Sequence, residues 1–413
     1  MLIEFSISNF LSFKEKNTFT MLASSDSTLK DNYLTVGNDN ILRITALYGA
    51  NASGKTNLFK ALAIISSMIK GSNFMVPNAL LPIIPFKLDE KTINEPSEFE
   101  IKFLANNIRY LYGFKADRKA VYEEYLTYYP NGRPVKIFSR SNGNNYIFNS
   151  SDEKILNDIK EKNTNNKFFI STATTWNYEK TKPAYDFLTE KLGVVLSYDQ
   201  INNYSYNMYY NDKSKKLENF ALNFLEKADF NVKGYTITEE KMTEDILRTM
   251  PEIVKPFFPL NTPMYKVSTT HIVKDKKYEF DISEESLGTQ VVFSFIPVLK
   301  DVLDNGKVLI IDEFDKSLHP FIVKYIVEVF NDTEINKNGA QLIFNTHDTN
   351  LLDLELLRRD QIWFAEKNEK DGSSTIYPLD DFSVRKTENV EKGYLLGRYG
   401  AIPFIESNFS DLK

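Results

Sequence analysis

Residues 49–56 have the sequence Gly-Ala-Asn-Ala-Ser-Gly-Lys-Thr, which fits the phosphate-loop pattern G-x-x-x-x-G-K-[ST] at every fixed position. The apolar stretch at residues 41–48 predicts a buried strand leading into this loop, and residues 57–70 predict a helix leaving it. Glycines let backbone N–H groups point at phosphate oxygens, and a helix N-terminus favours negative charge. These flanking elements favour a true phosphate site over a chance glycine loop.

The pattern predicts a role for most positions of the loop. We expect the nucleotide to contact eight residues of this stretch, namely Gly49, Asn51, Ala52, Ser53, Gly54, Lys55, Thr56 and Asn57. Lys55 would reach the β- and γ-phosphates and act in catalysis, and the Thr56 hydroxyl would bind Mg²⁺. A GTPase is disfavoured, because residues 336–338, Asn-Lys-Asn, lack the Asp of the guanine-specifying N-K-x-D motif.

Composition narrows the class of protein. The chain has 413 residues, of which 42% are hydrophobic, and this is ample for a core. A net charge of −6 gives no global field that would recruit nucleic acid, so any DNA contact would need a local patch. Without cysteine there are no disulfides, thiolate zinc sites or cysteine nucleophiles. No apolar run approaches the ~18 residues of a membrane span, and the N-terminus lacks a signal-peptide pattern, so we expect a cytoplasmic protein without membrane contact.

A second apolar strand, at residues 307–311, ends in the carboxylates Asp312 and Glu313. A fully apolar strand suits the centre of a parallel sheet, and ligands collect at the carboxyl ends of such strands. We expect Asp312 to hold Mg²⁺ and Glu313 to polarise the water that attacks the γ-phosphate. The alternative, an exposed acidic turn after a core strand, is less favoured with a phosphate loop upstream.

Taken together, these motifs resemble the ABC-type ATPase heads of SMC and repair proteins. In that resemblance Ser286, Gly288 and Thr289 form a degenerate signature motif that binds nucleotide, and His347 is the switch histidine that contacts the γ-phosphate. Alone, a Ser-x-Gly-Thr could equally be an ordinary helix N-cap. His319, in a Leu-His-Pro sequence like that of OLD-like ATPases, is more simply a structural residue at a helix entry.

The N-terminal sequence Asn9-Phe10-Leu11-Ser12-Phe13 strengthens the resemblance. Many such heads carry a basic residue that contacts phosphate or base where this chain has Leu11, and Lys14 is the basic residue close to it in the sequence. Residues 86–89 stand where related heads have a glutamine-containing loop, and they contain no Gln.

The predicted fold class is α/β: a P-loop NTPase head with a mostly parallel central sheet, a flanking antiparallel β-layer and an inserted helical lid. Alternating residues and Asn-Gly turns at 96–149 predict the antiparallel layer as a β-meander. Helical spacing without a sustained heptad predicts the lid. The expected boundaries are residues 1–149 for the first part of the head, 150–262 for the lid and 263–413 for the second part.

More closely, the chain resembles the bacterial abortive-infection ATPases of the RloA-like and AbiL-like group, related to OLD and PARIS. This closer resemblance rests on residues 9–13, 94–99, 360–364 and 391–403. The resemblance implies a homodimer with two ATP molecules sandwiched between the phosphate loop of one subunit and Ser286–Thr289 of the other. Because the chain stops soon after the head, a separate effector is expected, a TOPRIM-type nuclease or toxin, with residues 394–404 as either a docking segment or a packed tail.

Two other functions are compatible with the sequence. A DNA-repair ATPase that clamps DNA is the main alternative, and it would bind DNA with ATP and without a partner protein. A transporter motor is least favoured, because the N-terminal motif and the lid are repair-like.

Overall fold

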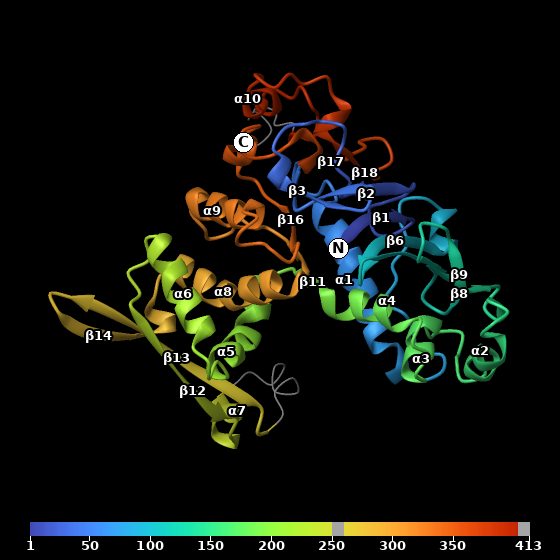
Figure 1. The fold of residues 1–413 in the computed structure, drawn as a ribbon, viewed down its shortest axis with the longest axis horizontal. Helices are drawn as coiled ribbons and strands as arrows, with labels where there is room; N and C mark the ends of the chain where they lie inside the picture. Colours follow the sequence, from blue (N-terminus) through green and yellow to red (C-terminus); the bar gives the residue numbers. More distant parts are fainter. Residues whose placement is uncertain (250–259, 404–413) are drawn as a thin grey trace, which may run out of the picture. The chain divides into compact units, whose positions relative to one another are not determined.

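The computed structural model describes residues 1–249 and 260–403, which form two compact units (Figure 1). The first unit contains Met1–Leu196, Asn305–Phe314 and the described part of Val327–Lys413, and the second contains Ser197–Asp304 and Asp315–Ile326. The phosphate loop, Asp312, Glu313 and His347 all belong to the first unit.

A six-stranded sheet forms the centre of the first unit. Its order is β11-β15-β16-β5-β17-β18, with parallel pairing throughout except for β18, which is antiparallel to β17. The strands are β5 (Ile44–Tyr48), β11 (Leu192–Val195), β15 (Val308–Ile311), β16 (Gln341–Asn345), β17 (Ile362–Lys367) and β18 (Ser374–Pro378). Strands β5, β15 and β16 are buried along their whole length, as apolar strands covered on both faces are. The predicted mostly parallel α/β sheet is confirmed.

The strand predicted at residues 41–48 is broken at Arg43, between β4 (Asp39–Leu42) and β5. The Arg43 side chain is buried and donates from Nη1 to the Asn336 carbonyl at 2.9 Å. Helix α1 (Lys55–Gly71) then follows the phosphate loop and buries an apolar face that includes Leu58, Leu62 and Ile65. The spacing of these residues at i, i+4 and i+7 explains why this segment is helical.

An antiparallel sheet of seven strands flanks the central sheet, in the order β10-β9-β8-β7-β6-β1-β2. Its strands are β1 (Leu2–Ser8), β2 (Asn17–Thr20), β6 (Ser97–Ala105), β7 (Ile108–Ala116), β8 (Val121–Tyr129), β9 (Val135–Ser141) and β10 (Asn145–Phe148). The predicted meander is therefore confirmed, and β1 and β2 pair as a hairpin at one end of the same sheet. Helices α2 (Glu153–Lys160), α3 (Phe169–Thr175) and α4 (Lys182–Asp186) lie beside it in Figure 1, and β3 (Tyr33–Val36) pairs separately with β4.

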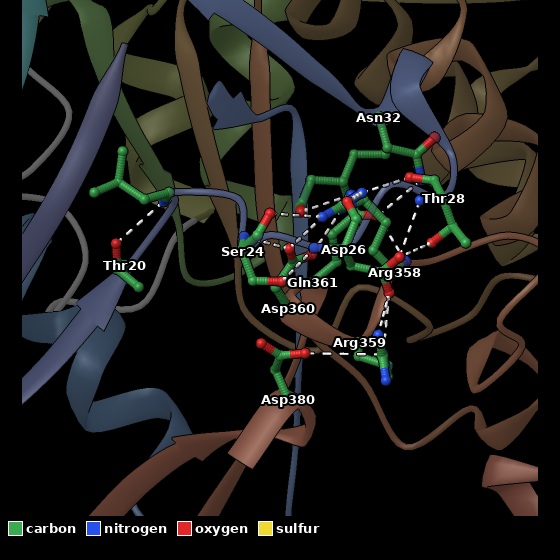
Figure 2. Close-up of polar contacts among 12 residues, drawn as sticks. Thr20, Ser24, Asp26, Thr28, Asn32, Arg358, Arg359, Asp360, Gln361 and Asp380 are labelled. Atoms are coloured by element: carbon green, nitrogen blue, oxygen red, sulfur yellow. Dashed lines mark hydrogen bonds and ion pairs between the residues drawn. The ribbon is translucent and has the colours of Figure 1, made fainter. Parts of the chain in front are cut away.

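A buried polar cluster ties the N-terminal segment at residues 24–32 to residues 358–361 (Figure 2). Arg358 is buried, pairs with the Asp360 carboxylate and donates from Nη1 to the Asp26 carbonyl at 2.8 Å. Arg359 donates from Nη2 to the Asp26 carboxylate at 2.6 Å. Because each charge has an opposite partner and hydrogen bonds, the cluster satisfies polar groups that would otherwise be costly to bury.

The second unit combines helices with a three-stranded antiparallel sheet, β12-β13-β14. Its elements are α5 (Asn202–Tyr210), α6 (Lys216–Lys227), β12 (Gly234–Lys241), α7 (Glu244–Thr249), β13 (Pro263–Val273), β14 (Lys276–Asp281), nearly all of α8 (Leu287–Asn305) and the first half of α9 (Pro320–Asn331). Tyr209 of α5 stacks on Phe293 of α8 with ring centroids 4.6 Å apart and contacts Tyr235 of β12 at 4.8 Å. Aromatic packing therefore joins the helices to the sheet.

The compact units divide the chain at different places from the boundaries expected at residues 149/150 and 262/263. Residues 150–196 belong to the first unit, because β11 pairs with β15 in the central sheet. Residues 263–304 belong to the second unit, and the segment expected to be a helical lid also contributes β12 to a sheet. The three-part division of the head and lid stays a prediction.

Candidate functional site

The phosphate loop follows β5 directly and has the backbone geometry that its glycines allow. Gly49 and Gly54 have φ values of 152° and 108°, and Ala52 is left-handed at 61°. A Cβ at Gly49 would overlap the Ala365 carbonyl oxygen, and one at Gly54 would overlap Ser374. Both glycines are therefore needed for conformation and for space. Asn51 and Ala52 are exposed at the tip of the loop, whereas Ser53 and Gly54 are buried.

Lys55 begins α1 and is folded back over the loop. Its Nζ donates to the Gly49 carbonyl at 2.6 Å and to the Ala50 carbonyl at 2.9 Å, and the residue is 7% exposed. The ammonium group thus lies inside the curve of the loop, beside the first N–H groups of α1, which have no acceptor within the helix. The positive charge of Lys55 and the N-terminus of α1 therefore converge where the motif predicts phosphate oxygens.

The loop meets the acidic strand through Thr56. Its Oγ1 donates to Oδ1 of Asp312 at 3.0 Å, across a sequence separation of 256 residues. The register of the parallel sheet explains this meeting: Ile311 of β15 is opposite Phe344 of β16, and Asn345 of β16 is opposite Leu47 of β5. The carboxyl ends of the three strands therefore reach the same edge.

Asn345, the last residue of β16, links the two acidic residues. Its Nδ2 donates to Oδ1 of Asp312, and its Oδ1 accepts from the Glu313 backbone N–H at 2.5 Å. Glu313 is exposed and has a left-handed φ of 52°, an unfavourable conformation for a residue with a side chain. Asn345 holds this turn in place. Asn345 belongs to no motif in the sequence, and its role depends on the pairing of β16 with β15.

His347 lies two residues beyond Asn345 and is exposed in the same unit as the loop. The residue after it, Asp348, is tied to the loop side of the sheet, because the Tyr48 hydroxyl donates to its carbonyl at 3.1 Å. Thr349 donates to Glu391 of α10 (Val390–Leu395) at 2.7 Å. The switch segment therefore rests on the C-terminal helix.

The segment at residues 394–404 begins in that helix, which ends at Leu395. Tyr394 is buried and packs on Tyr48, with ring centroids 5.8 Å apart, and stacks on Phe364 at 5.5 Å. Leu395 and Leu396 are exposed, by 59% and 62%. Phe404 of the predicted docking segment lies outside the described residues.

The N-terminal turn lies against the start of α1. Ser12 accepts from Asn57 Nδ2 at 2.9 Å and from Ser374 Oγ at 2.8 Å, while Leu11 is left-handed at φ 51°. Leu11, Ser12 and Asn57 line a cavity of about 380 Å³ that also borders Phe86 and Lys367. The segment at residues 86–89 thus contributes to a cavity at the loop, and the Phe86 N–H donates to Asn9 Oδ1 at 3.0 Å.

Ser286, Gly288 and Thr289 belong to the second unit, at the beginning of α8. Ser286 Oγ accepts from the Thr289 N–H at 3.1 Å, which is the N-cap bond considered as the alternative. A Cβ at Gly288 would lie 3.1 Å from the Ser317 carbonyl, so this close approach favours glycine. His319 Nδ1 accepts from the Phe321 N–H at 3.2 Å at the start of α9, as a structural helix-entry residue does.

The loop has chemistry that fits a nucleoside triphosphate. The Ser53 hydroxyl is buried and has no hydrogen-bond partner within the protein, which is costly unless a ligand oxygen accepts from it. Thr56 and Asp312 offer two hard oxygen atoms of the kind that Mg²⁺ binds together with phosphates and water. Among the described residues no group of three His, Cys, Asp or Glu side chains could hold a metal alone. A Mg²⁺ ion here would therefore depend on the substrate phosphates.

Sequence comparison identifies the family. Residues 44–353, from β5 to just beyond His347, match the AAA_21 family, described as "AAA domain, putative AbiEii toxin, Type IV TA system". The chain belongs to this family. Members of this family are ATPases that bind ATP, normally with Mg²⁺, and the chain is an ATPase with an α/β P-loop fold. No curated protein matches the AAA_21-family chain in sequence.

Solved structures give weaker likenesses. The SMC head domain from Thermotoga maritima is 15% identical, with a TM-score of 0.41 over 91% of this chain and 98% of that one. The protein cbiO1 from Clostridium perfringens, part of the ABC transporter complex cbiONQ, is 11% identical, with a TM-score of 0.31 over 97% of this chain and 96% of that one. Because the sequence identities are 15% and 11% and the TM-scores are 0.41 and 0.31, neither likeness bears on function. Within the described residues, every helix is too short or too polar to cross a lipid bilayer.

Proposed function

We propose that this AAA_21-family ATPase is the nucleotide-driven subunit of an anti-phage abortive-infection complex, in which ATP-dependent dimerisation controls a separate effector. The observation that carries the ATP-dependent part is the contact of Thr56 with Asp312, which joins the phosphate loop to the acidic strand. The residues near this contact are Lys55, Asn345 and Glu313, which are of the types that transfer of a phosphoryl group to water needs.

In the proposed mechanism, Lys55 exchanges the Gly49 and Ala50 carbonyls for the β- and γ-phosphates of ATP. Ser53 donates its unpaired hydroxyl hydrogen to a phosphate oxygen. Thr56 and Asp312 are the residues that would hold Mg²⁺, and the bound ion supplies charge neutralisation on the transferring phosphoryl group.

Hydrolysis itself is assigned to two exposed side chains at the sheet edge. Glu313 orients the attacking water and accepts its proton at the carboxylate as the water oxygen bonds to phosphorus and ADP leaves. His347 donates a hydrogen bond to the γ-phosphate. Their exposure in one subunit agrees with a site that a second subunit covers.

The covering surface is proposed to be the start of α8 from the second copy. Ser286 and Thr289 would turn from their mutual cap to the γ-phosphate, and Gly288 would allow close backbone approach. Because the site is complete only in the homodimer, nucleotide state becomes a conformational signal.

The defence role is proposed from two supports. The matching family is named for a toxin of a toxin–antitoxin system, and the motifs resemble the RloA-like and AbiL-like ATPases, with relatives in OLD and PARIS. The expected effector is a TOPRIM-type nuclease or a toxin. The second candidate is a DNA-repair clamp, which the Asn9–Phe13 resemblance favours and which Leu11, in place of a basic residue, disfavours.

The decisive experiment uses Glu313→Gln, which should bind ATP and hydrolyse it slowly. We expect mass measurement to show a dimer with ATP and a smaller species without it. Co-purification with the product of the adjacent gene then tests the effector. Wild-type turnover in the variant would remove the base role of Glu313, and ATP-stimulated DNA binding without any partner would favour the repair clamp.

A further inference from the structure

The distal half of the β13-β14 hairpin, residues 271–280, continues past the end of β12, whose pairing with β13 ends at Gly234 opposite Thr270. At the base of this half, His271 Nε2 lies 2.6 Å from the Glu285 carboxylate. Figure 1 shows the hairpin extending beyond the helices of the second unit. Four apolar residues of this half are 41–48% exposed, namely Ile272, Val273, Tyr278 and Phe280. A two-stranded ribbon that leaves this much apolar surface in water gains little from its own packing, and such surface is typical of an association site.

Within residues 1–249 and 260–403, strand β14 is an edge strand with β13 as its one neighbour. It is the last strand of the β12-β13-β14 sheet, and residues 276–280 are all exposed. An edge strand presents a row of backbone donors and acceptors that another strand can use. The partner that this edge fits can be derived from its register and its charges.

The register determines which backbone groups face outward. The turn residues Lys274 and Asp275 both have positive φ, of 49° and 61°, so the turn is a two-residue type I′ turn closed by the Lys276 N–H and the Val273 carbonyl. Hydrogen-bonded pairs alternate along an antiparallel ribbon. Tyr278 therefore bonds to His271 of β13, whereas the N–H and C=O groups of Lys277 and Glu279 point to the open edge.

The outward backbone groups and the side-chain charges of Lys277 and Glu279 together make the edge complementary to a second copy of itself. If a second β14 pairs antiparallel with Tyr278 at the centre, Lys277 of each copy is opposite Glu279 of the other. Opposite charges placed directly across a strand pair are stabilising. The same register puts Tyr278 against Tyr278 and keeps both apolar faces on one side, whereas a one-residue slip would place each apolar face beside a polar one.

We propose that β14 is a docking edge for a second copy of this chain, which joins two three-stranded sheets into one six-stranded sheet about a two-fold axis. The interface is isologous, as a two-fold contact requires. The β14–β14 interface is small, so we do not expect tight binding from it alone. It acts by raising the effective concentration of one copy around the other. The proposal does not depend on the ATP sandwich.

The chain has no cysteine, so a single introduced thiol reports the contact without background. In the full-length, nucleotide-free protein, Tyr278→Cys puts two thiols in a non-hydrogen-bonded pair, with Cα atoms about 4.5 Å apart. The matched control is Lys274→Cys, at the exposed turn of the same hairpin. In the proposed register its two copies are roughly 27 Å apart, eight residues at about 3.4 Å each. We expect oxidation to cross-link the first variant at least about tenfold faster than the second.

A charge swap tests the register in the Tyr278→Cys background. Glu279→Lys sets like charges opposite each other at both symmetric positions and should slow cross-linking about tenfold. Adding Lys277→Glu exchanges the two charges and should restore the original rate. Equal rates at positions 278 and 274, or a double variant as slow as the single one, would overturn the proposal. The lysines would then serve only to protect the edge from pairing. ATP hydrolysis is measured separately, so this failure leaves the proposed ATP-dependent function standing.

Discussion

Replacing Asn345 by alanine should slow ATP hydrolysis without weakening ATP binding. The side chain makes two bonds within the site: its Nδ2 donates to Asp312, and its Oδ1 accepts from the Glu313 N–H. It is 2% exposed, so water does not readily replace these bonds. Asp312 keeps its bond from Thr56 in the variant, whereas the Glu313 N–H loses this acceptor.

The magnitude follows from the backbone of Glu313. A left-handed residue other than glycine costs roughly 1–2 kcal/mol, and the bond to Asn345 offsets about 0.5–1.5 kcal/mol of it. Without that bond, the conformer that presents the Glu313 carboxylate should become about tenfold less populated, since about 1.4 kcal/mol is a factor of ten. We therefore expect kcat to fall about tenfold, less than the 10²- to 10⁴-fold, roughly, that a lost general base costs.

Steady-state ATPase assays at saturating Mg²⁺ and ATP measure kcat, and nucleotide titration measures affinity. Asn336→Ala is the matched control, because Asn336 is also buried in the first unit and makes three hydrogen bonds through its side chain. Its partners, Phe330 and Ala340, precede β16, whereas Asn345 is at the other end of that strand. Both variants should lose about 1–3 kcal/mol of unfolding free energy, but only Asn345→Ala should lose turnover.

A double variant separates orientation of Glu313 from a general loss of structure. If Asn345 acts through Glu313, then Asn345→Ala should cost little further turnover in a Glu313→Gln background. An unchanged kcat in the single variant, or an equal loss in both backgrounds, would refute the positioning role of Asn345.

Three further predictions test other parts of the protein. Lys55→Ala should abolish ATP binding in a fluorescent-nucleotide titration, and undiminished affinity would refute the loop assignment. Ser286→Arg should block hydrolysis while single subunits still bind ATP; normal hydrolysis by a monomeric species would refute the sandwich. Burial raises the pKa of Asp26, but hydrogen bonds from Thr28 and Arg359 outweigh it and lower the pKa to about 2 (Figure 2). The ionised Asp26 therefore contributes its full stabilisation of the folded protein above pH ~4, and this contribution is lost as the pH falls toward 2. Asp26→Asn should therefore lower the urea midpoint at pH 7 and converge on the wild type in acid; an equal deficit at both pH values would contradict this.

The sequence carries enough information to predict the central elements of the head, because their signals are local and strong. An apolar strand, a glycine loop and an amphipathic helix follow one another without a gap at residues 44–71, and each has its own pattern. The acidic residues after β15 could be placed near the loop from strand polarity alone, since parallel strands bring their carboxyl ends to one edge. The structure places Thr56 and Asp312 within hydrogen-bond distance, and their role in binding stays a prediction.

The signals that the sequence lacks are those that depend on strand order. Asn345 matters because β16 lies next to β15, and nothing in residues 341–345 states which strand is the neighbour. The same cause explains β11. Its four residues, Leu192–Val195, follow helical segments and are too short for a periodicity, yet they complete the edge of the central sheet. Pairing across more than a hundred residues is a tertiary property.

In the second unit, the Glu285 carboxylate connects the two proposed association surfaces, which are the start of α8 and the edge of β14. Glu285 immediately precedes Ser286, and its side chain accepts from Thr269 and lies 2.6 Å from His271 Nε2, both on β13. Tyr278 of the free edge is the register partner of that same His271. Because these contacts fix the start of α8 to the middle of the hairpin, a copy docked on β14 should restrict the positions that Ser286 can take. Edge pairing would then favour closure over ATP by lowering the entropy lost at the signature residues, a coupling that does not require a change in their mean structure.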